Sequence, residues 1–213
     1  MAKVAPTILA SDAADFAARI ERVKPFAKRI HVDISDGQFT PTKTVGLAQV
    51  YGLDGAELDL HLMLQDPAAQ FESILALEPS LVIIHFEADG NHSEIIRRYQ
   101  AVGVRAGLAI LEDTKIEQVA KLLPEADHLL VFCGTLGYNH GKFNASVLDK
   151  IAEAKAINPQ LEVAVDGGID QSSARLAIDA GADVLNSGSF IQDAPDPEVA
   201  YVGLEAIAGG ETT

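Results

Sequence analysis

The sequence predicts an α/β protein, a single (β/α)8 TIM barrel with parallel strands, and three observations support this prediction. Eight apolar, strand-like runs alternate with helix-like runs along the chain. The apolar runs are almost continuous, as is typical of parallel strands that are buried on both faces. No linker or break in composition divides the 213 residues, so we expect one domain over residues 1–213. A doubly wound open sheet is the second choice, and the number of strand–helix pairs favours the barrel.

The expected strands are apolar runs that stop at polar or turn-forming residues. They cover residues 3–9, 29–34, 57–63, 81–85, 104–110, 128–132, 161–165 and 182–185. The expected helices begin behind residues that cap helices well, such as Ser11 or Asp12 and the pair Asp66-Pro67. The first helix ends at about residue 23, a short helix lies near residue 47, and another begins at residue 67. The remaining helices are expected over residues 92–102, 114–123, 145–157, 171–180 and 197–208.

The composition limits the classes of partner. The formal net charge is -15 at pH 7, which argues against nucleic acid or an anionic membrane, because both would be repelled. An anionic ligand would therefore need helix N-termini and backbone N–H groups. The lone cysteine, Cys133, excludes an intrachain disulfide and fits a reducing compartment. No signal-like segment or membrane-spanning apolar run is visible, so we expect a soluble, cytoplasmic protein.

Polar side chains stand at the carboxyl ends of three expected strands, which is where TIM barrels have their active sites. His31 and Asp33 share one face of the second strand, because side chains alternate along a strand. His61 lies near the end of the third strand, and Asp166 directly follows the seventh. Two imidazoles and two carboxylates that converge there suit one divalent transition metal ion, namely zinc, iron, manganese or cobalt.

Two carboxylates on opposite sides of a metal suit the removal of a proton beside a carbonyl group. The metal stabilises the resulting enediolate as a Lewis acid. One carboxylate takes the proton and the other returns a proton to the opposite face, which inverts a single carbon atom. Gly167 and Gly168 after the seventh strand, and Gly188 and Ser189 after the eighth, lie where such barrels usually bind phosphate.

Several motifs resemble those of the ribulose-phosphate 3-epimerase family, and the resemblance covers essentially the whole chain. The family's Pro-Ser-Ile-Leu-Ser-Ala-Asp is similar to residues 6–12, and its His-x-Asp-x-Met-Asp-Gly-x-Phe-x-Pro to residues 31–41. Its Asp-x-His-Leu-Met is similar to residues 59–63. Residues 85–88, 165–168 and 187–189 resemble the family at the end of the fourth strand and at the phosphate-binding corner.

The resemblance implies a metal-dependent isomerase of the pentose phosphate pathway that converts D-ribulose 5-phosphate to D-xylulose 5-phosphate. The metal would be held by His31, Asp33, His61 and Asp166, with Asp33 and Asp166 as the catalytic acid and base. The partner is then a small-molecule sugar phosphate, which would be contacted by Thr7, His61, Met63, Gly137, Gly167, Gly168, Gly188 and Ser189. The resemblance also implies a homo-oligomer.

The chain departs from the family beside the expected substrate. In the family's Pro-Gly-Phe-Gly-Gly-Gln-x-Phe loop after the sixth strand, only Gly137 and Phe143 match strictly. Ser35 and Phe132 replace methionines near the reacting carbons. Two alternatives therefore stay open. One is an epimerase of another ketose phosphate, such as allulose 6-phosphate, and the other is a non-catalytic sugar-phosphate-binding homologue.

Two other chemistries found on barrels are disfavoured. A Schiff-base aldolase would need a lysine at the carboxyl end of a strand, and the sequence places none there. Related decarboxylases and synthases resemble one another in an Asp-x-Lys-x-x-Asp pattern. Here the residue two positions after Asp33 is Ser35 rather than lysine.

Overall fold

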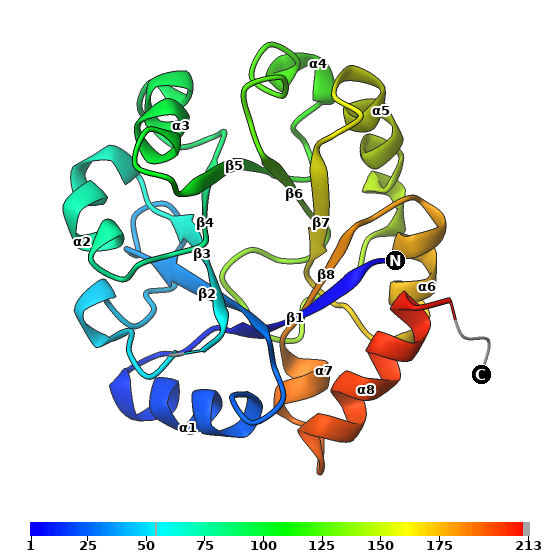
Figure 1. Ribbon diagram of the computed structural model, residues 1–213. Helices are drawn as coiled ribbons and strands as arrows, with labels where there is room; N and C mark the ends of the chain where they lie inside the picture. Colours follow the sequence, from blue (N-terminus) through cyan, green and yellow to red (C-terminus); the bar gives the residue numbers. More distant parts are fainter. Residues whose placement is uncertain (54, 211–213) are drawn as a thin grey trace.

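The computed structural model describes residues 1–53 and 55–210. Within them, eight strands pair in parallel in the order of the sequence, and the first also pairs with the last, so that the sheet closes into a barrel (Figure 1). The strands are β1 (Lys3–Ile8), β2 (Arg29–Ser35), β3 (Glu57–Met63), β4 (Leu81–His85), β5 (Arg105–Ile110), β6 (His128–Phe132), β7 (Glu162–Asp166) and β8 (Val184–Ser187). The predicted (β/α)8 TIM barrel is confirmed.

Helices surround the barrel (Figure 1). In chain order they are α1 (Ala13–Val23), η1 (Leu47–Gln49), η2 (Pro67–Gln70), α2 (Phe71–Leu75), α3 (His92–Gln100), α4 (Ile116–Val119), η3 (Ala145–Val147), α5 (Asp149–Ile157), α6 (Gln171–Asp179), α7 (Ser189–Gln192) and α8 (Pro197–Ala208), where η marks a 3-10 helix. The predicted caps form: Asp12 accepts hydrogen bonds from two backbone N–H groups at the start of α1, and Asp66 does the same for η2.

The helix predicted over residues 114–123 is much shorter than expected. Only the four residues of α4 are helical, and tight turns follow, in which the N–H groups of Leu122 and Leu123 both bond to the Val119 carbonyl. Pro124 comes next. It has no N–H and restricts the residue before it, so a regular helix cannot continue through this point.

Strand β8 begins and ends two residues later than predicted. Its pairing with β1 joins Ala5 to Asn186 and Pro6 to Ser187, and its pairing with β7 joins Asp166 to Asn186. Neighbours on both sides therefore extend the strand past the apolar run. As a result Asn186, which the sequence pattern placed in a loop, is a strand residue at the same level as Asp166.

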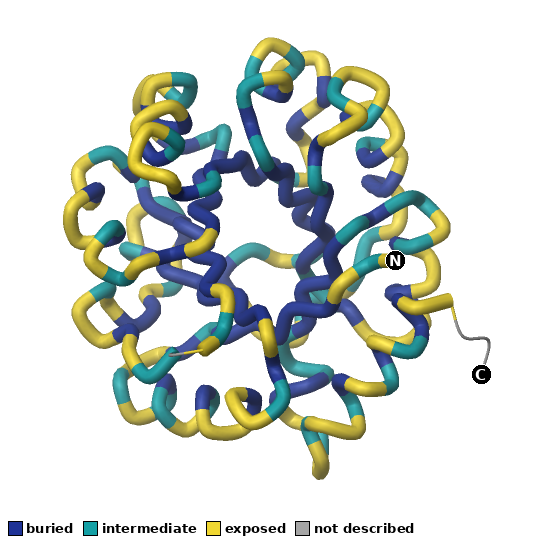
Figure 2. Tube along the Cα trace, in the orientation of Figure 1, coloured by how far each residue is buried: buried dark blue, intermediate teal, exposed yellow. Residues whose placement is uncertain are grey.

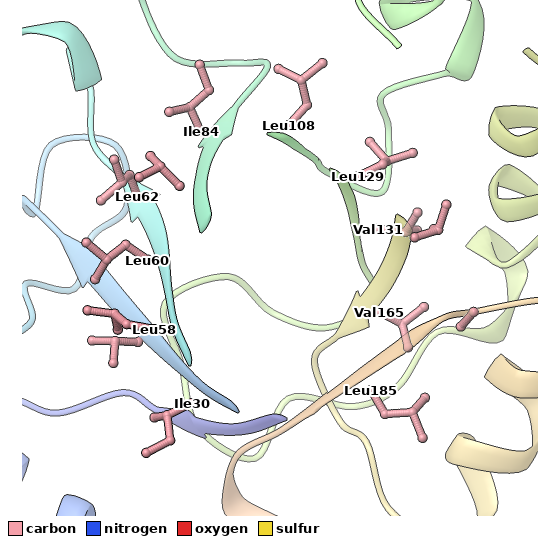
Figure 3. Packing of buried hydrophobic residues seen from close by; sticks show 14 of the residues in the cluster. Ile30, Leu58, Leu60, Leu62, Ile84, Leu108, Leu129, Val131, Val165 and Leu185 are labelled. Atoms are coloured by element: carbon pink, nitrogen blue, oxygen red, sulfur yellow. The ribbon is translucent and has the colours of Figure 1, made fainter. Parts of the chain in front are cut away.

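The apolar side chains form two clusters, because strand side chains alternate between the two faces of the barrel wall. The larger cluster lies between strands and helices, and Figure 3 shows side chains such as Leu60, Ile84 and Val131 on this outer face. Figure 2 shows the same arrangement as a ring of buried strands inside helices whose outer faces are exposed. The smaller cluster fills the barrel and consists of Ala5, Leu81, Ile83, Ala109, Leu130, Ala164 and Val184.

A buried ionic cluster occupies the barrel at the amino ends of the strands. Arg29, at the start of β2, lies with its Nε 2.6 Å from Asp59 Oδ2. Its two terminal nitrogens lie 3.0 and 2.9 Å from the carboxylate oxygens of Glu162, at the start of β7. Nδ1 of His128 lies 2.9 Å from Glu162 Oε2. In TIM barrels this end serves stability, whereas the carboxyl ends of the strands carry the chemistry.

Among the described residues, no helix combines the length and the apolar composition that are needed to cross a membrane.

Candidate active site

Four polar side chains meet at the carboxyl ends of β2, β3 and β7. They are the four residues grouped in the sequence as metal ligands, His31, Asp33, His61 and Asp166, and all of them are buried. One ligand atom of each lies within 4.8 Å of those of the other three. Asp33 Oδ1 lies 2.7 Å from His61 Nδ1 and 3.3 Å from His31 Nε2. His31 Nε2 is also 3.4 Å from Asp166 Oδ2, so one imidazole nitrogen lies close to both carboxylates.

Each imidazole directs one nitrogen to this cluster and the other nitrogen away from it. His31 Nδ1 lies 3.1 Å from the side-chain amide of Asn186. The amide oxygen is buried without another partner and can accept the hydrogen of Nδ1, which leaves the lone pair of Nε2 for a cation. His61 Nε2 lies 2.8 Å from Nε2 of His85, the last residue of β4. Nδ1 of His85 lies 3.2 Å from Glu87 Oε2. Contacts of this kind hold metal-binding imidazoles in one orientation.

The two carboxylates have opposite pKa shifts. Burial opposes the ionisation of Asp33, but the neighbouring imidazoles of His31 and His61 hold its pKa well below its usual range. Burial, and then the charge of Asp33, raise the pKa of Asp166 to about 7, against the smaller opposing effects of His31 and the Gly167 N–H. At neutral pH one carboxyl is therefore ionised, and the other can gain or lose a proton.

The donor set fits a divalent transition metal. Two imidazole nitrogens and two carboxylates are ligands that zinc, iron, manganese and cobalt all accept. Burial lowers the pKa of His61 to about 4, so the neutral imidazole that a metal requires is present at neutral pH. His31 Nε2 and Asp166 Oδ2 are buried without a hydrogen-bond partner. Buried polar atoms of this kind are costly unless something binds them, and a cation would bind both.

A cavity of about 40 Å³ adjoins the cluster at the barrel mouth. It is lined by Asp33, Asp166 and all the predicted substrate-contact residues except His61, namely Thr7, Met63, Gly137, Gly167, Gly168, Gly188 and Ser189. The hydroxyl oxygen of Thr7 is buried there without a hydrogen-bond partner. A cavity needs roughly 10–15 Å³ of such space to hold one water molecule, so this volume has room for only a few waters.

The segment 137–141 after β6 walls this cavity and crosses the barrel opening, where it is yellow-green in Figure 1. The Thr42 hydroxyl donates a hydrogen bond to the Gly137 carbonyl at 2.7 Å. The Ser35 hydroxyl donates to the Thr42 carbonyl, also at 2.7 Å. Two departures from the family pattern, Ser35 and the altered loop after β6, are thus connected through Thr42.

Close backbone packing requires glycine at the end of β7. Gly167 and Gly168 both have a positive φ, of 96° and 74°. A Cβ on Gly168 would lie 2.6 Å from the Gly141 carbonyl oxygen and 2.6 Å from the Phe143 nitrogen. The two glycines therefore let the loops after β6 and β7 pack together, in addition to any contact with a ligand.

Replacing Gly168 with Ala should displace the segment 141–143 and lower the thermal unfolding midpoint. The matched control is Gly103→Ala, because Gly103 also has a positive φ, of 83°, but its Cβ would meet nothing within 4 Å. The control should lose about 1 kcal/mol of stability from backbone conformation alone. We expect Gly168→Ala to lose clearly more, in calorimetry of both variants. Equal losses would show that the close approach has no energetic consequence.

Three residues of this site were assigned no catalytic or ligand-binding role by the sequence analysis, although residues 85–88 were part of the family resemblance. His85 and Glu87 carried a usable signal, because they stand at the carboxyl end of β4, the position that singled out His31 and His61. Asn186 carried none, since it was placed beyond the last strand. Its contact with His31 joins residues 155 positions apart, which a local pattern cannot reveal.

The model of the Ribulose-phosphate 3 epimerase family matches residues 3–192 of the chain. Among curated proteins, the chain is similar to the ribulose-phosphate 3-epimerase of Schizosaccharomyces pombe, with 32% identity over 95% of this chain and 92% of that protein. It is also similar to the cytoplasmic isoform of ribulose-phosphate 3-epimerase from Oryza sativa subsp. japonica, with 34% identity over 99% of this chain and 96% of that protein.

Solved structures with the same fold include a 3-hexulose-6-phosphate synthase from Salmonella typhimurium. The TM-score is 0.73 at 18% identity, over 99% of this chain and 100% of the other. A 3-keto-L-gulonate-6-phosphate decarboxylase from Vibrio cholerae superposes with a TM-score of 0.72 at 12% identity, over 100% of this chain and 99% of the other. At this identity the likeness extends to the fold alone.

Proposed function

This chain belongs to the ribulose-phosphate 3-epimerase family, and from this premise we propose that it inverts carbon 3 of D-ribulose 5-phosphate to give D-xylulose 5-phosphate. The family membership confirms the resemblance seen in the motifs and makes the chain an isomerase of carbohydrate metabolism. The observation that most supports the proposed reaction is the buried pair Asp33 and Asp166, which lie in one cluster and have pKa values shifted in opposite directions.

Proton transfer on two faces follows from that pair. Asp33 is ionised at neutral pH and accepts the proton of carbon 3 on one face of the substrate. Asp166, whose pKa is raised to about 7, delivers a proton to the opposite face. After one turnover Asp33 holds a proton and Asp166 has lost one, which is the state from which the reverse reaction starts. A divalent metal held by His31, Asp33, His61 and Asp166 would supply Lewis-acid stabilisation of the enediolate charge.

The substrate pocket must enlarge before a sugar phosphate can enter. The present cavity of about 40 Å³ is far below the roughly 300 Å³ or more of ordinary ligand pockets. The segment 137–141 is the longest stretch of the wall that lies outside the helices and strands, so we propose that it moves outward. The phosphate would then bind at Gly167, Gly168, Gly188 and Ser189, where backbone N–H groups can hold an anion in an acidic protein.

The substrate could also be another ketose phosphate. Phe132 makes one wall of the site bulkier than in the family pattern given above, and the Ser35 hydroxyl donates to the Thr42 carbonyl beside the altered loop. Phe132 lines the cavity directly. Allulose 6-phosphate is therefore the second candidate substrate, with the same metal-ligand cluster and the same pair of carboxyls.

Proton NMR in deuterated water tests the reaction. The protein is supplied with zinc or manganese and given ribulose 5-phosphate, with a chelated sample as the control. We expect xylulose 5-phosphate to form with deuterium at carbon 3, and the chelated sample to be inactive until metal is restored. Turnover of allulose 6-phosphate alone would replace the first candidate by the second. No exchange with either sugar would leave a non-catalytic binder and contradict the proposal.

We also propose that residues 1–213 form one domain and that the protein works in the cytoplasm as a homo-oligomer. The rice relative that is named a cytoplasmic isoform matches the chain over 99% of its length, which supports that location. The net charge of -15 supports the absence of nucleic-acid and anionic-membrane partners, because it would repel both.

A further inference from the structure

A line of hydrogen bonds runs from the metal-ligand cluster into the wall of the barrel. It begins at His61 on β3, passes to His85 on β4 at 2.8 Å between the two Nε2 atoms, and ends on Glu87 at 3.2 Å from His85 Nδ1. His61 and His85 are both fully buried, so water cannot replace either partner. Each proton on this line must therefore be placed by the side chains themselves.

Glu87 determines which atoms donate and which accept along this line of hydrogen bonds. Its Oε1 accepts hydrogen bonds from the Leu111 N–H, at 3.0 Å, and from the Thr114 hydroxyl. Burial opposes its ionisation, but His85, Leu111 and Thr114 lower its pKa to about 2. An ionised carboxylate only accepts hydrogen bonds, so Nδ1 of His85 must carry the hydrogen that points to Glu87 Oε2.

The tautomer of His61 follows from that of His85. A neutral His85 with its hydrogen on Nδ1 has only a lone pair on Nε2. The hydrogen between the two Nε2 atoms then belongs to His61. Nδ1 of a neutral His61 is left with its lone pair directed at Asp33 Oδ1, 2.7 Å away. Two acceptors that face each other at this distance need a cation between them.

We propose that Glu87 and His85 are positioning residues that set the tautomer of His61, so that its Nδ1 is the nitrogen offered to the metal. The inference rests on the proposed metal centre and adds to it two residues that do not touch the metal. Partners behind a ligand imidazole commonly change metal affinity by about 10–100-fold when they are removed.

The change Glu87→Gln should reverse the direction of hydrogen-bond donation along this line while keeping the shape of the side chain. Leu111 and Thr114 still donate to one side-chain atom, which must then be the amide oxygen. The amide NH2 therefore faces His85 and donates to its Nδ1. His85 then carries its hydrogen on Nε2 and donates to His61, whose hydrogen moves to Nδ1. This nitrogen can no longer bind a metal.

The test is a zinc titration of the metal-free protein, with Zn²⁺ alone as the probe, in wild type, Glu87→Gln and Glu162→Gln. Glu162 is a matched control, because it also accepts from a histidine Nδ1, that of His128 at 2.9 Å, but at the opposite end of the barrel. We expect Glu87→Gln to raise the zinc Kd by about 10–100-fold. Glu162→Gln should lower the unfolding midpoint and leave the zinc Kd unchanged.

Nitrogen NMR of the histidine rings gives a second result that does not depend on affinity. We expect His85 to carry its hydrogen on Nδ1 in the wild type and on Nε2 in Glu87→Gln. Equal zinc affinities with His85 unchanged would overturn the inference and leave the metal centre intact. A wild-type protein that binds no zinc, manganese or cobalt would instead overturn the proposed centre, and this inference with it.

Discussion

Replacing Asp166 with Asn should abolish epimerisation, with a fall in kcat of at least about 10³-fold under saturating metal. Removal of a positioned acid or base typically costs about 10²–10⁴-fold, and in the proposed site the same carboxyl would also be a metal ligand. The matched control is Asp170→Asn, four residues further on, where the side chain caps α6 through the N–H groups of Ser172 and Ser173. Asn caps helices as well as Asp does, so this control should keep full activity.

The same substitution should stabilise the metal-free protein at alkaline pH. The folded pKa of Asp166, about 7, lies above its ordinary value of 3.8. Its contribution to stability is therefore fully present below about pH 4 and is lost as the pH rises through 7. Since each pKa unit is worth about 1.4 kcal/mol, the wild type should lose on the order of a few kcal/mol across this range. Because Asn does not titrate, the Asp166→Asn variant should not show this loss of stability.

Denaturant unfolding of chelated wild type and Asp166→Asn at pH 5 and pH 8 measures this effect. We expect the variant to be the more stable protein at pH 8, and the difference to be smaller at pH 5. A variant that is less stable at pH 8, or that still turns over substrate at the wild-type rate, would contradict the role given to Asp166. A gain in stability at pH 8 separates Asp166 from a structural carboxyl, because structural carboxyls stabilise the fold when they are ionised.

Replacing Arg29 with Met should lower stability by about 3–5 kcal/mol, which is typical when one member of a buried ion pair is removed. Arg29 is 4% exposed and is the shared partner of Asp59 and Glu162. Without it, the buried carboxylate of Asp59 and the partly buried carboxylate of Glu162 lose the cation that they share. Denaturant unfolding should show this loss, while kcat/KM of the folded protein stays unchanged, because the site lies at the other end of the barrel.

Arg97→Met is the control for the loss of a cation as such. Arg97 pairs with Glu125 at 3.1 Å, but its side chain is 68% exposed, and pairs of this kind contribute little.

The ionic cluster around Arg29 should also make the wild type sensitive to acid. Its hydrogen bonds hold the pKa of Glu162 below the ordinary 4.5, despite burial. Its stabilisation is present above about pH 4.5 and is lost as the pH falls. If the stability of Arg29→Met falls with decreasing pH in the same way as that of the wild type, this prediction is contradicted.

The sequence was sufficient for the barrel and for the grouping of the cluster, because both depend on local patterns. Apolar runs place the strands, and alternation along β2 puts His31 and Asp33 on one face. Parallel strands end at one edge, so His61 and Asp166 are brought to the same place. Neither inference requires knowledge of the distances between residues on different strands.

The supporting contacts could not be predicted, since they depend on register between distant segments. Asn186 meets His31 only because β8 extends two residues past its apolar run. His85 meets His61 across 24 positions of sequence, and Thr42 meets Gly137 across 95. None of these pairs has a sequence spacing that marks it. The helix predicted over 114–123 was too long, because tight turns replace helical hydrogen bonds after Val119.

Deuterium exchange from each epimer separately tests the two-carboxyl assignment most directly. Asp166→Asn, saturated with metal in deuterated water, is given ribulose 5-phosphate in one sample and xylulose 5-phosphate in the other, and carbon 3 is followed by NMR. If Asp33 and Asp166 act on opposite faces, one epimer will exchange its proton without being converted, and the other will not exchange. Exchange of both epimers at equal rates would show that a single group serves both faces, and would contradict the account.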